Sequence, residues 1–163
     1  MTSVRIDYAD FAKLAPGVME GLGAIGKAVG GSGLGKDLIE LIKLRASQLN
    51  GCAFCLQYHL NLARSLHVST DKLDQLAAWH EAPVFSPRER LALAYAEQLT
   101  LSAQGAISDE LFAQVLAEFG PADLSFLTAS VAHINAWNRI GKALRFTPPA
   151  PRQEHQQAPT AKP

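Results

Sequence analysis

Two cysteines and a histidine form the stretch of this sequence that is best suited to chemistry. Cys52 and Cys55 are the only cysteines, and His59 follows four positions after the second. On a helix, at about 100° per residue, all three side chains fall on one face. Gly51 breaks the chain just before them, so we expect the cysteines in the first turns of a helix, where its positive end favours thiolate over thiol. Two thiols and a base in a positive field are suited to thiol–disulfide or peroxide chemistry.

The Cys-x-x-Cys motif has other chemical interpretations. A structural zinc site would need a second pair of ligands elsewhere, and the sequence offers none at a suitable spacing. Covalent haem attachment is excluded, because it would need a histidine where Leu56 stands. Both cysteines could instead be inert, since free cysteine is among the most buried residue types. We favour a redox dithiol without metal or cofactor, because residues three apart at a helix start can form a disulfide and His59 can accept the Cys55 proton.

Composition narrows the classes of function. The chain has 163 residues, enough for one domain with a real core, and its 15 basic residues balance its 15 acidic ones. A neutral chain lacks the broad positive surface that attracts nucleic acids or anionic membranes. No apolar run approaches the roughly 18 to 20 residues of a membrane span, and no secretory signal is visible. We therefore expect a cytoplasmic protein with neither nucleic-acid nor membrane partners.

Hydrophobic periodicity predicts helices throughout and no strand, so the expected fold class is all-α. Capping residues and glycine or proline breaks set the expected helix ends. The expected helices cover residues 7–14, 16–29, 36–48, 52–66, 70–80, 87–101, 108–120 and 121–144. From Phe146 onward proline and glutamine are frequent, so this stretch is expected to form a mobile tail.

Glu40 lies in the most apolar of these helices, where a carboxylate is costly unless it has a partner. One interpretation pairs it with Lys43 or Arg45 on its own helix. The other places it against the cysteine helix across an antiparallel pair, where it would orient His59 or relay its proton. The residues alone leave both interpretations open.

Polar residues also recur in the last helix, at His133, Asn135 and Asn138. In a crowded apolar helix such groups usually satisfy one another or neighbouring backbone groups. We therefore expect a structural role for all three.

Together these motifs resemble those of the alkylhydroperoxidase-D-like proteins of the carboxymuconolactone decarboxylase superfamily. The resemblance covers roughly residues 35–144. Its segments are Glu40, Cys52-x-x-Cys55 with His59, residues 87–100 and residues 134–139. It implies a compact all-α helical bundle that assembles into homotrimers or homohexamers. Broad apolar faces, such as that of residues 38–49, also predict an oligomer, because they exceed what a small bundle buries alone.

The same resemblance implies a thiol-dependent peroxidase. Such a protein reduces a hydroperoxide through a dithiol–disulfide cycle and is reduced again by a dithiol protein or a small thiol. By similarity, Cys55 is the peroxidatic cysteine and Cys52 the resolving one, and Glu40 and His59 form the proton relay. One position departs from the pattern: better-characterised peroxidase members carry a histidine just before the second cysteine, where this chain has Phe54.

Two alternatives to a peroxidase follow from the same residues. A carboxymuconolactone decarboxylase-like enzyme would carry the cysteines incidentally, and a non-catalytic redox-sensing module would use the disulfide to switch a partner interaction. Turnover of a hydroperoxide with a dithiol reductant separates the peroxidase from both. The expected organisation is an N-terminal helical extension at 1–34, the alkylhydroperoxidase-D-like core at 35–145 and the flexible tail at 146–163.

Overall fold

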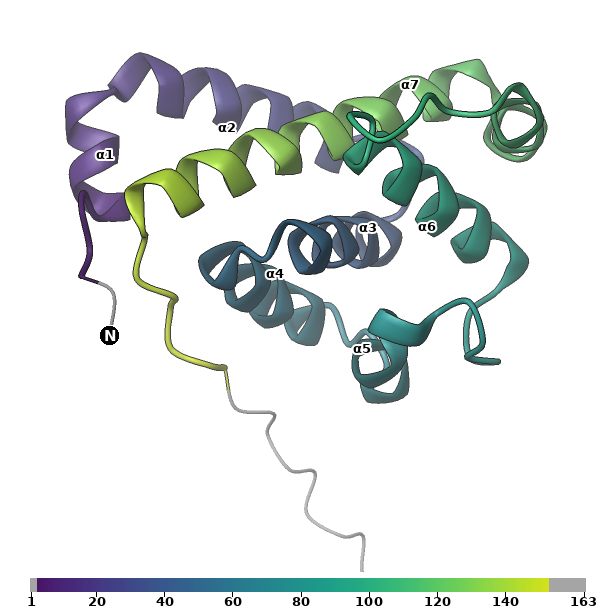
Figure 1. Ribbon diagram of the computed structural model, residues 1–163, viewed down its shortest axis with the longest axis horizontal. Coiled ribbons are helices and arrows are strands. Elements are labelled where there is room, and N and C mark those ends of the chain that lie inside the picture. Colours follow the sequence, from purple (N-terminus) through teal and green to yellow (C-terminus); the bar gives the residue numbers. More distant parts are fainter. Residues whose placement is uncertain (1–2, 153–163) are drawn as a thin grey trace, which may run out of the picture.

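A computed structural model describes residues 3–152 of the chain (Figure 1). This part contains seven α-helices, one 3₁₀ turn and no strand, which confirms the predicted all-α class. The helices are α1 (Tyr8–Leu14), α2 (Pro16–Gly30), α3 (Lys36–Asn50), α4 (Ala53–Ser65), α5 (Thr70–Gln75), α6 (Pro87–Thr100) and α7 (Asp109–Leu144). Within residues 3–152, no helix combines the length and apolar character needed to cross a membrane.

Local chemistry explains where several helices begin and end. At the start of α6, the Ser86 side chain accepts from the Glu89 N–H and the Glu89 carboxylate accepts from the Ser86 N–H, which forms a capping box. Gly51 ends α3 with φ of 62°, a left-handed conformation that glycine adopts without steric cost. Gly120, with φ of 69°, interrupts the helical geometry of α7. The predicted break at residues 120–121 is therefore a kink between two helical parts of α7.

The expected helix at residues 70–80 is shorter than predicted. α5 ends at Gln75 and a 3₁₀ turn follows at Leu76–Ala78. Beyond this turn, the Arg90 guanidinium of α6 donates to the carbonyls of Trp79 and Ala82. These carbonyls have a partner outside a helix, so the chain can leave the helical path before Pro83 without unsatisfied groups.

α3 is the central helix of the fold and contacts α4, α6 and α7 (Figure 1). Its buried residues are Leu38, Ile39, Glu40, Leu41, Ile42, Lys43, Leu44, Ala46 and Ser47. The prediction of a buried central helix is thus confirmed. Other helices of the same chain cover this apolar surface, however, so α3 gives no reason for a second copy. Large apolar side chains that stay exposed occur instead on α1, α2, α4 and α7, among them Leu14, Val18, Ile25, Tyr58, Leu62, Phe112 and Leu116.

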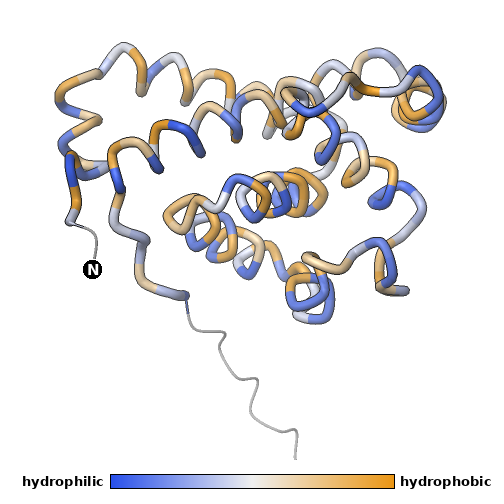
Figure 2. The backbone as a smooth tube through the Cα atoms, viewed as in Figure 1, coloured by the Kyte–Doolittle hydropathy of each residue, from blue (hydrophilic) through white to orange (hydrophobic). Residues whose placement is uncertain are grey.

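The segments near both ends of the described chain pack against other helices of the bundle. α2 runs along α7, and the segment that leaves α7 runs down past one end of α4 (Figure 1). Hydrophobic positions recur along every helix, whereas this last segment is mainly pale or blue (Figure 2). It contacts α4 through Asn61, which donates to the Ala150 carbonyl and accepts from the Arg152 N–H, both at 2.8 Å. Residues 153–163 of the predicted tail lie outside the described part, and the three-part division of the chain stays a prediction.

Candidate active site

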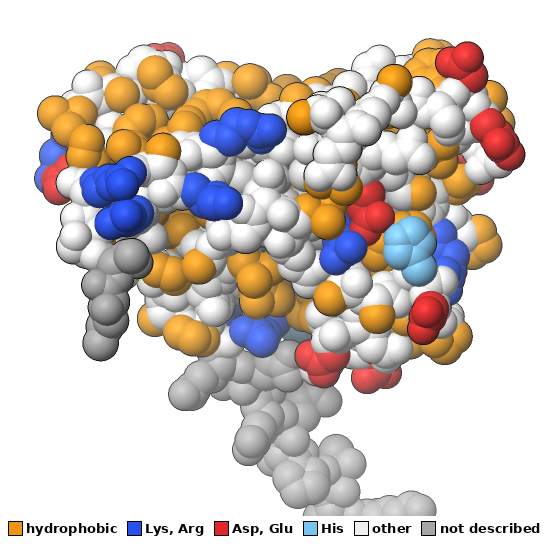
Figure 3. Space-filling view, in the orientation of Figure 1, with side chains coloured by type: hydrophobic (Ala, Val, Ile, Leu, Met, Phe, Trp, Pro, Cys, Tyr) orange, Lys and Arg blue, Asp and Glu red, His pale blue; other side chains and the backbone are white. Residues whose placement is uncertain are grey.

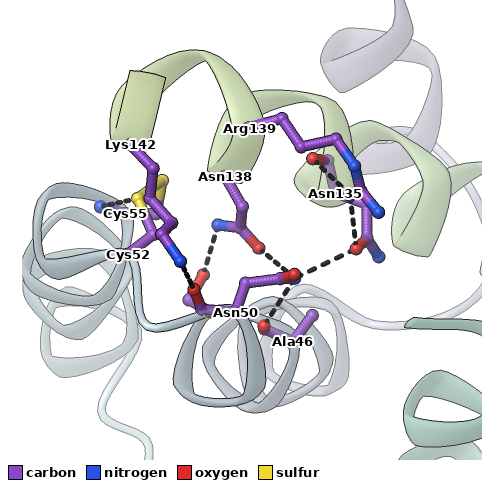
Figure 4. Close-up of a disulfide and its surroundings, with 9 residues drawn as sticks. Ala46, Asn50, Cys52, Cys55, Asn135, Asn138, Arg139 and Lys142 are labelled. Carbon is purple, nitrogen blue, oxygen red and sulfur yellow. Dashed lines mark hydrogen bonds between the residues drawn. A yellow bond between two sulfur atoms is a disulfide. The ribbon is translucent and has the colours of Figure 1, made fainter. Parts of the chain in front are cut away.

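Cys52 and Cys55 are joined by a disulfide at the start of α4 (Figure 4). Cys52 is the N-cap residue and Cys55 lies in the first turn, with the two Cα atoms 5.4 Å apart. The Cys55 N–H donates to Cys52 Sγ at 3.3 Å, so the positive helix start faces that sulfur. Both cysteines are only 2% exposed. A reacting molecule can therefore reach either sulfur only through a hollow in the surface.

A network of side-chain amides fixes the turn that precedes the disulfide (Figure 4). The Asn50 amide donates to Asn138 Oδ1 at 2.9 Å and to Asn135 Oδ1 at 3.0 Å. Asn138 in turn donates to Ser47 Oγ at 3.0 Å, and Lys142 donates to the Asn50 carbonyl at 2.6 Å. The end of α3 is thereby tied to α7. The two asparagines of α7 have the structural role expected from the sequence, and that role is to hold this turn.

Glu40 meets partners on two helices. Its Oε2 lies 2.6 Å from His59 Nδ1 on α4, and its Oε1 lies 3.5 Å from Lys43 Nζ on α3. All three side chains are buried. Both interpretations of Glu40 are therefore correct: it pairs with Lys43 on its own helix and contacts His59 on α4. Arg45, the other expected partner, binds Glu97 instead, with 2.5 Å between Nε and Oε1.

The surroundings of Glu40 keep its carboxyl ionised. Burial alone would raise its pKa, but the hydrogen bond with His59 and the electrostatic interactions with His59 and Lys43 together lower it below the ordinary value of 4.5. A carboxylate only accepts hydrogen bonds, so Nδ1 of His59 carries a proton and donates to Glu40. The other ring nitrogen, Nε2, is then available to take up a proton.

A cavity of about 260 Å³ is lined by His59 and Lys43 and also by Cys55. Cys55, His59 and Lys43 form its polar wall together with Tyr58 and His133. Side chains from α1, α2, α4 and α7 complete it, namely Tyr8, Met19, Leu22, Phe54, Leu62 and Trp137. Among the described residues, no group of three or more side chains is arranged to hold a metal ion. The cavity thus presents one sulfur and one base within largely apolar walls.

Phe54, the residue that departs from the pattern expected by resemblance, packs in an aromatic cluster. Its ring centroid lies 5.3 Å from that of Tyr8, 5.2 Å from that of Phe146 and 6.1 Å from that of Tyr58. Offset and edge-on pairs at these distances are favourable. Phe54 therefore links α1 and the segment after α7 to the cysteine helix, and it adds no ionisable group beside Cys55.

His133 is a site residue that the sequence analysis assigned only a structural role. It lines the cavity with Cys55 and His59, and its Nε2 accepts from Trp137 Nε1 at 2.9 Å. Burial, followed by the charge of Lys43, lowers the pKa of His133 to about 4, so the ring is neutral at pH 7. The spacing of four between His133 and Trp137 places both on one face of α7. Nothing in the sequence indicated that this face meets the cysteine helix.

Comparison with known proteins places this architecture in a family. A sequence model of the Carboxymuconolactone decarboxylase family matches residues 16–98, a range that includes Glu40, both cysteines and His59. The uncharacterized protein YdfG of Bacillus subtilis (strain 168) is 34% identical over 142 residues, which cover 87% of this chain and 95% of YdfG.

Solved structures agree with that match. A protein of unknown function from Agrobacterium tumefaciens, whose description relates it to the antioxidant defence protein AhpD, is 34% identical and superposes with a TM-score of 0.84 over 91% of this chain and 99% of its own. An uncharacterized peroxidase-related protein with an alkylhydroperoxidase AhpD core, from Ralstonia eutropha JMP134, shares the fold at 22% identity, with a TM-score of 0.76 over 86% of this chain and 75% of its own. This chain belongs to the carboxymuconolactone decarboxylase family and has the AhpD-like all-α fold.

Proposed function

We propose that this protein is a thiol-dependent peroxidase that reduces hydroperoxides through Cys52 and Cys55. The observation that carries the proposal is a single cavity wall in which Cys55 meets His59, whose ring is held by ionised Glu40 at 2.6 Å. A nucleophile and an oriented base are what peroxide attack requires. The apolar remainder of the wall fits the organic part of an alkyl hydroperoxide. The likeness to proteins described as AhpD-like and peroxidase-related supports the same class of reaction.

The proposed cycle begins with the reduced dithiol. His59 takes the Cys55 proton, and the thiolate attacks the terminal peroxide oxygen. The O–O bond breaks, Cys55 becomes a sulfenic acid, and the alkoxide leaves as an alcohol after taking up a proton. The Cys52 thiolate, favoured by the helix start, then attacks Cys55 Sγ and displaces hydroxide, which is protonated to water. Two electrons have passed from the dithiol to the peroxide, and the two cysteines end as a disulfide.

The cycle closes when a dithiol protein or a small thiol reduces the disulfide in the cytoplasm. We also propose that the protein works as a homotrimer or homohexamer. Exposed apolar side chains on α1 and α2 supply surface for another copy, since Leu14 is 71% exposed, Val18 48% and Ile25 42%. Light scattering at micromolar concentration should report a multiple of 17.5 kDa. A particle of 17.5 kDa under these conditions would contradict the assembly.

A peroxide-consumption assay with a dithiol donor tests the activity. Wild-type protein should turn over an alkyl hydroperoxide repeatedly, Cys55→Ser should not react, and Cys52→Ser should stop after one equivalent. His67→Asn is a matched control, because His67 is exposed and has a φ of 58°, a conformation that asparagine tolerates. Peroxide consumption by Cys55→Ser at the wild-type rate would reject the peroxidase. The decarboxylase-like enzyme or the non-catalytic redox-sensing module would then be the better account.

A further inference from the structure

The two sulfurs of the disulfide belong to different hollows in the surface. Cys55 lines the cavity of about 260 Å³ described above, whereas Cys52 lines a separate, more open groove of about 530 Å³. Cys52 is absent from the wall of the cavity, and Cys55 is absent from the wall of the groove. The proposed cycle assigns the hydroperoxide to the Cys55 side, so it leaves the groove at Cys52 free to bind another reactant.

The groove lies between the start of α4 and the end of α7. Gly51 and Phe54 contribute to one side, and Gly141 and Phe146 contribute to the other. A Cβ atom on Gly141 would stand 3.3 Å from Cys52 Sγ, which is tighter than an ordinary van der Waals contact. The same Cβ atom would stand 3.6 Å from Cys55 Sγ, so the glycine lets α7 pack closely against the disulfide where it borders the groove.

The groove carries positive charge. Lys142 and Arg145 line it, and no carboxylate from residues 3–152 does. Arg5 adds a third cation at the same end of α7, where its guanidinium donates to the Ala143 carbonyl. Asp7 is a carboxylate in this neighbourhood and accepts from the backbone N–H of Thr147, beside the groove. Lysine and arginine side chains gather where α1 meets the end of α7 (Figure 3). Three cations against one carboxylate attract an anion.

We propose that this groove is the entrance of the reductant, and that the reductant is a small thiol that carries a negative charge, such as a carboxylate. The proposal rests on the redox cycle proposed above and assigns a second binding site to it. Cys52 is 2% exposed, so the flat surface of a partner protein cannot bring a thiol against its sulfur. A groove of about 530 Å³ fits a small molecule. The positive charges of Lys142 and Arg145 in the groove favour a molecule with a negative charge.

The exchange proceeds in two balanced steps. The thiolate of the first reductant molecule attacks Cys52 Sγ; the disulfide bond breaks and its electron pair goes to Cys55, on the side of His59. A second thiolate then attacks the reductant's sulfur in the mixed disulfide. Cys52 leaves as a thiolate, which the Cys55 N–H stabilises. Two thiols become one disulfide, and the disulfide of the protein becomes two thiols. Oxidant and reductant use separate entrances, so neither has to leave before the other binds.

Three thiols with the same two-carbon skeleton provide the test, namely 2-mercaptoethanesulfonate (anionic), 2-mercaptoethanol (neutral) and cysteamine (cationic). The rate of reduction of the oxidised protein is measured by alkylation and mass spectrometry and expressed per thiolate. In Lys142→Gln/Arg145→Asn, glutamine can still donate to the Asn50 carbonyl and asparagine suits the φ of 58° at residue 145. Lys27→Gln/Lys36→Gln is the matched control, because it removes two exposed charges outside the groove.

The expected result is a change in charge preference. One unit charge about 7 Å from the attacking thiolate changes its local concentration by roughly threefold in water. The ratio of the anionic to the neutral rate should therefore fall by about sevenfold in the groove variant, because two charges are removed, and by less in high salt. It should stay unchanged in the control. Gly141→Ala should slow all three thiols, because its Cβ atom would crowd Cys52 Sγ beside the groove. An unchanged ratio in the groove variant, or an unchanged rate in Gly141→Ala, would overturn the proposal.

Oxidation of the pre-reduced protein by an alkyl hydroperoxide is measured in parallel. A protein that fails to consume peroxide but keeps the charge preference would reject the peroxidase and retain the groove. A protein that consumes peroxide normally but shows no charge preference would reject the groove alone.

Discussion

Replacement of His59 by alanine should slow peroxide attack most strongly at neutral pH. His59 shares the cavity with Cys55, and its Nδ1 is fixed by Glu40 at 2.6 Å. An unperturbed thiol has a pKa of about 8.5, so at pH 7 only a few per cent of it is thiolate without help. A positioned general base typically contributes roughly 10²- to 10⁴-fold. The unaided thiolate fraction limits the loss in this case, so we expect His59→Ala to lose about thirtyfold in the rate of sulfenic acid formation at pH 7.

Glu40→Gln should produce a smaller loss in the same step. Glutamine can still accept the Nδ1–H bond, but the acceptor is neutral. A charged hydrogen bond contributes about 1.5–3 kcal/mol and a neutral one about 0.5–1.5 kcal/mol, so the difference is about 1 kcal/mol. This corresponds to roughly fivefold in rate, since 1.4 kcal/mol is tenfold.

Stopped-flow mixing of the pre-reduced protein with excess hydroperoxide, between pH 6 and pH 10, measures both effects. The rates of peroxide attack by wild type and by His59→Ala should become equal above pH 9, where the Cys55 thiol ionises without a base. His67→Asn should follow the wild type at every pH. Parallel curves for wild type and His59→Ala, separated by less than threefold at pH 7, would refute the relay.

Other substitutions around the site have defined consequences. Glu40→Gln should reduce the free energy of unfolding by about 2–3 kcal/mol at pH 7, because buried Lys43 loses its counterion. Folding lowers the pKa of Glu40, so its charge stabilises the fold fully at pH values above the pKa of the unfolded state. This stabilisation is lost as the pH falls through the pKa of the folded state. Urea unfolding between pH 7 and pH 3 measures the loss. Asn138→Ala should cost about 2–3 kcal/mol in urea unfolding, because buried Ser47 and half-buried Asn50 each lose a hydrogen bond. Phe54→His should raise peroxidase turnover near pH 7 and lower the Tm by a few degrees, because it adds an ionisable ring and weakens the aromatic cluster.

Each of these substitutions has an outcome that contradicts its reasoning. An unfolding difference for Glu40→Gln that is equal at pH 7 and pH 3 would mean that its charge does not stabilise the fold. Wild-type stability of Asn138→Ala would show that the amide network is dispensable. Lower turnover by Phe54→His with an unchanged Tm would mean that the phenylalanine assists the chemistry directly.

The local signals in the sequence predicted most of the fold. Ser86 and Glu89 specify a capping box, and Gly51 specifies a left-handed helix end, because such features depend on neighbours a few positions away. The helix at 70–80 was predicted too long, because Arg90, ten and more positions away, takes carbonyls that would otherwise continue it. A periodic pattern carries no information about such distant partners.

The same distinction applies to the candidate site. Helical spacing correctly placed Cys55 and His59 on one side of α4, whereas Cys52 faces a different hollow. Whether Glu40 faced His59 depended on how two helices pack. His133 was assigned a purely structural role, because its place beside Cys55 follows from the packing of α7 against α2 and α4. The sequence predicted α2 only as a helix at residues 16–29, yet this helix forms part of the cavity wall through Gly23 and Gly26. Periodicity identifies the buried face of a helix, and only the packed structure identifies what lies opposite.

The number of thiols lost per peroxide tests the central claim most directly. Pre-reduced protein is mixed with one equivalent of an alkyl hydroperoxide, then alkylated and weighed by mass spectrometry, and Cys52→Ser is treated in parallel with a probe for sulfenic acids. The account predicts that wild type consumes one peroxide and loses both alkylatable thiols, and that the variant carries one sulfenic acid, at Cys55. Two alkylatable thiols in the wild-type protein after peroxide treatment would contradict it.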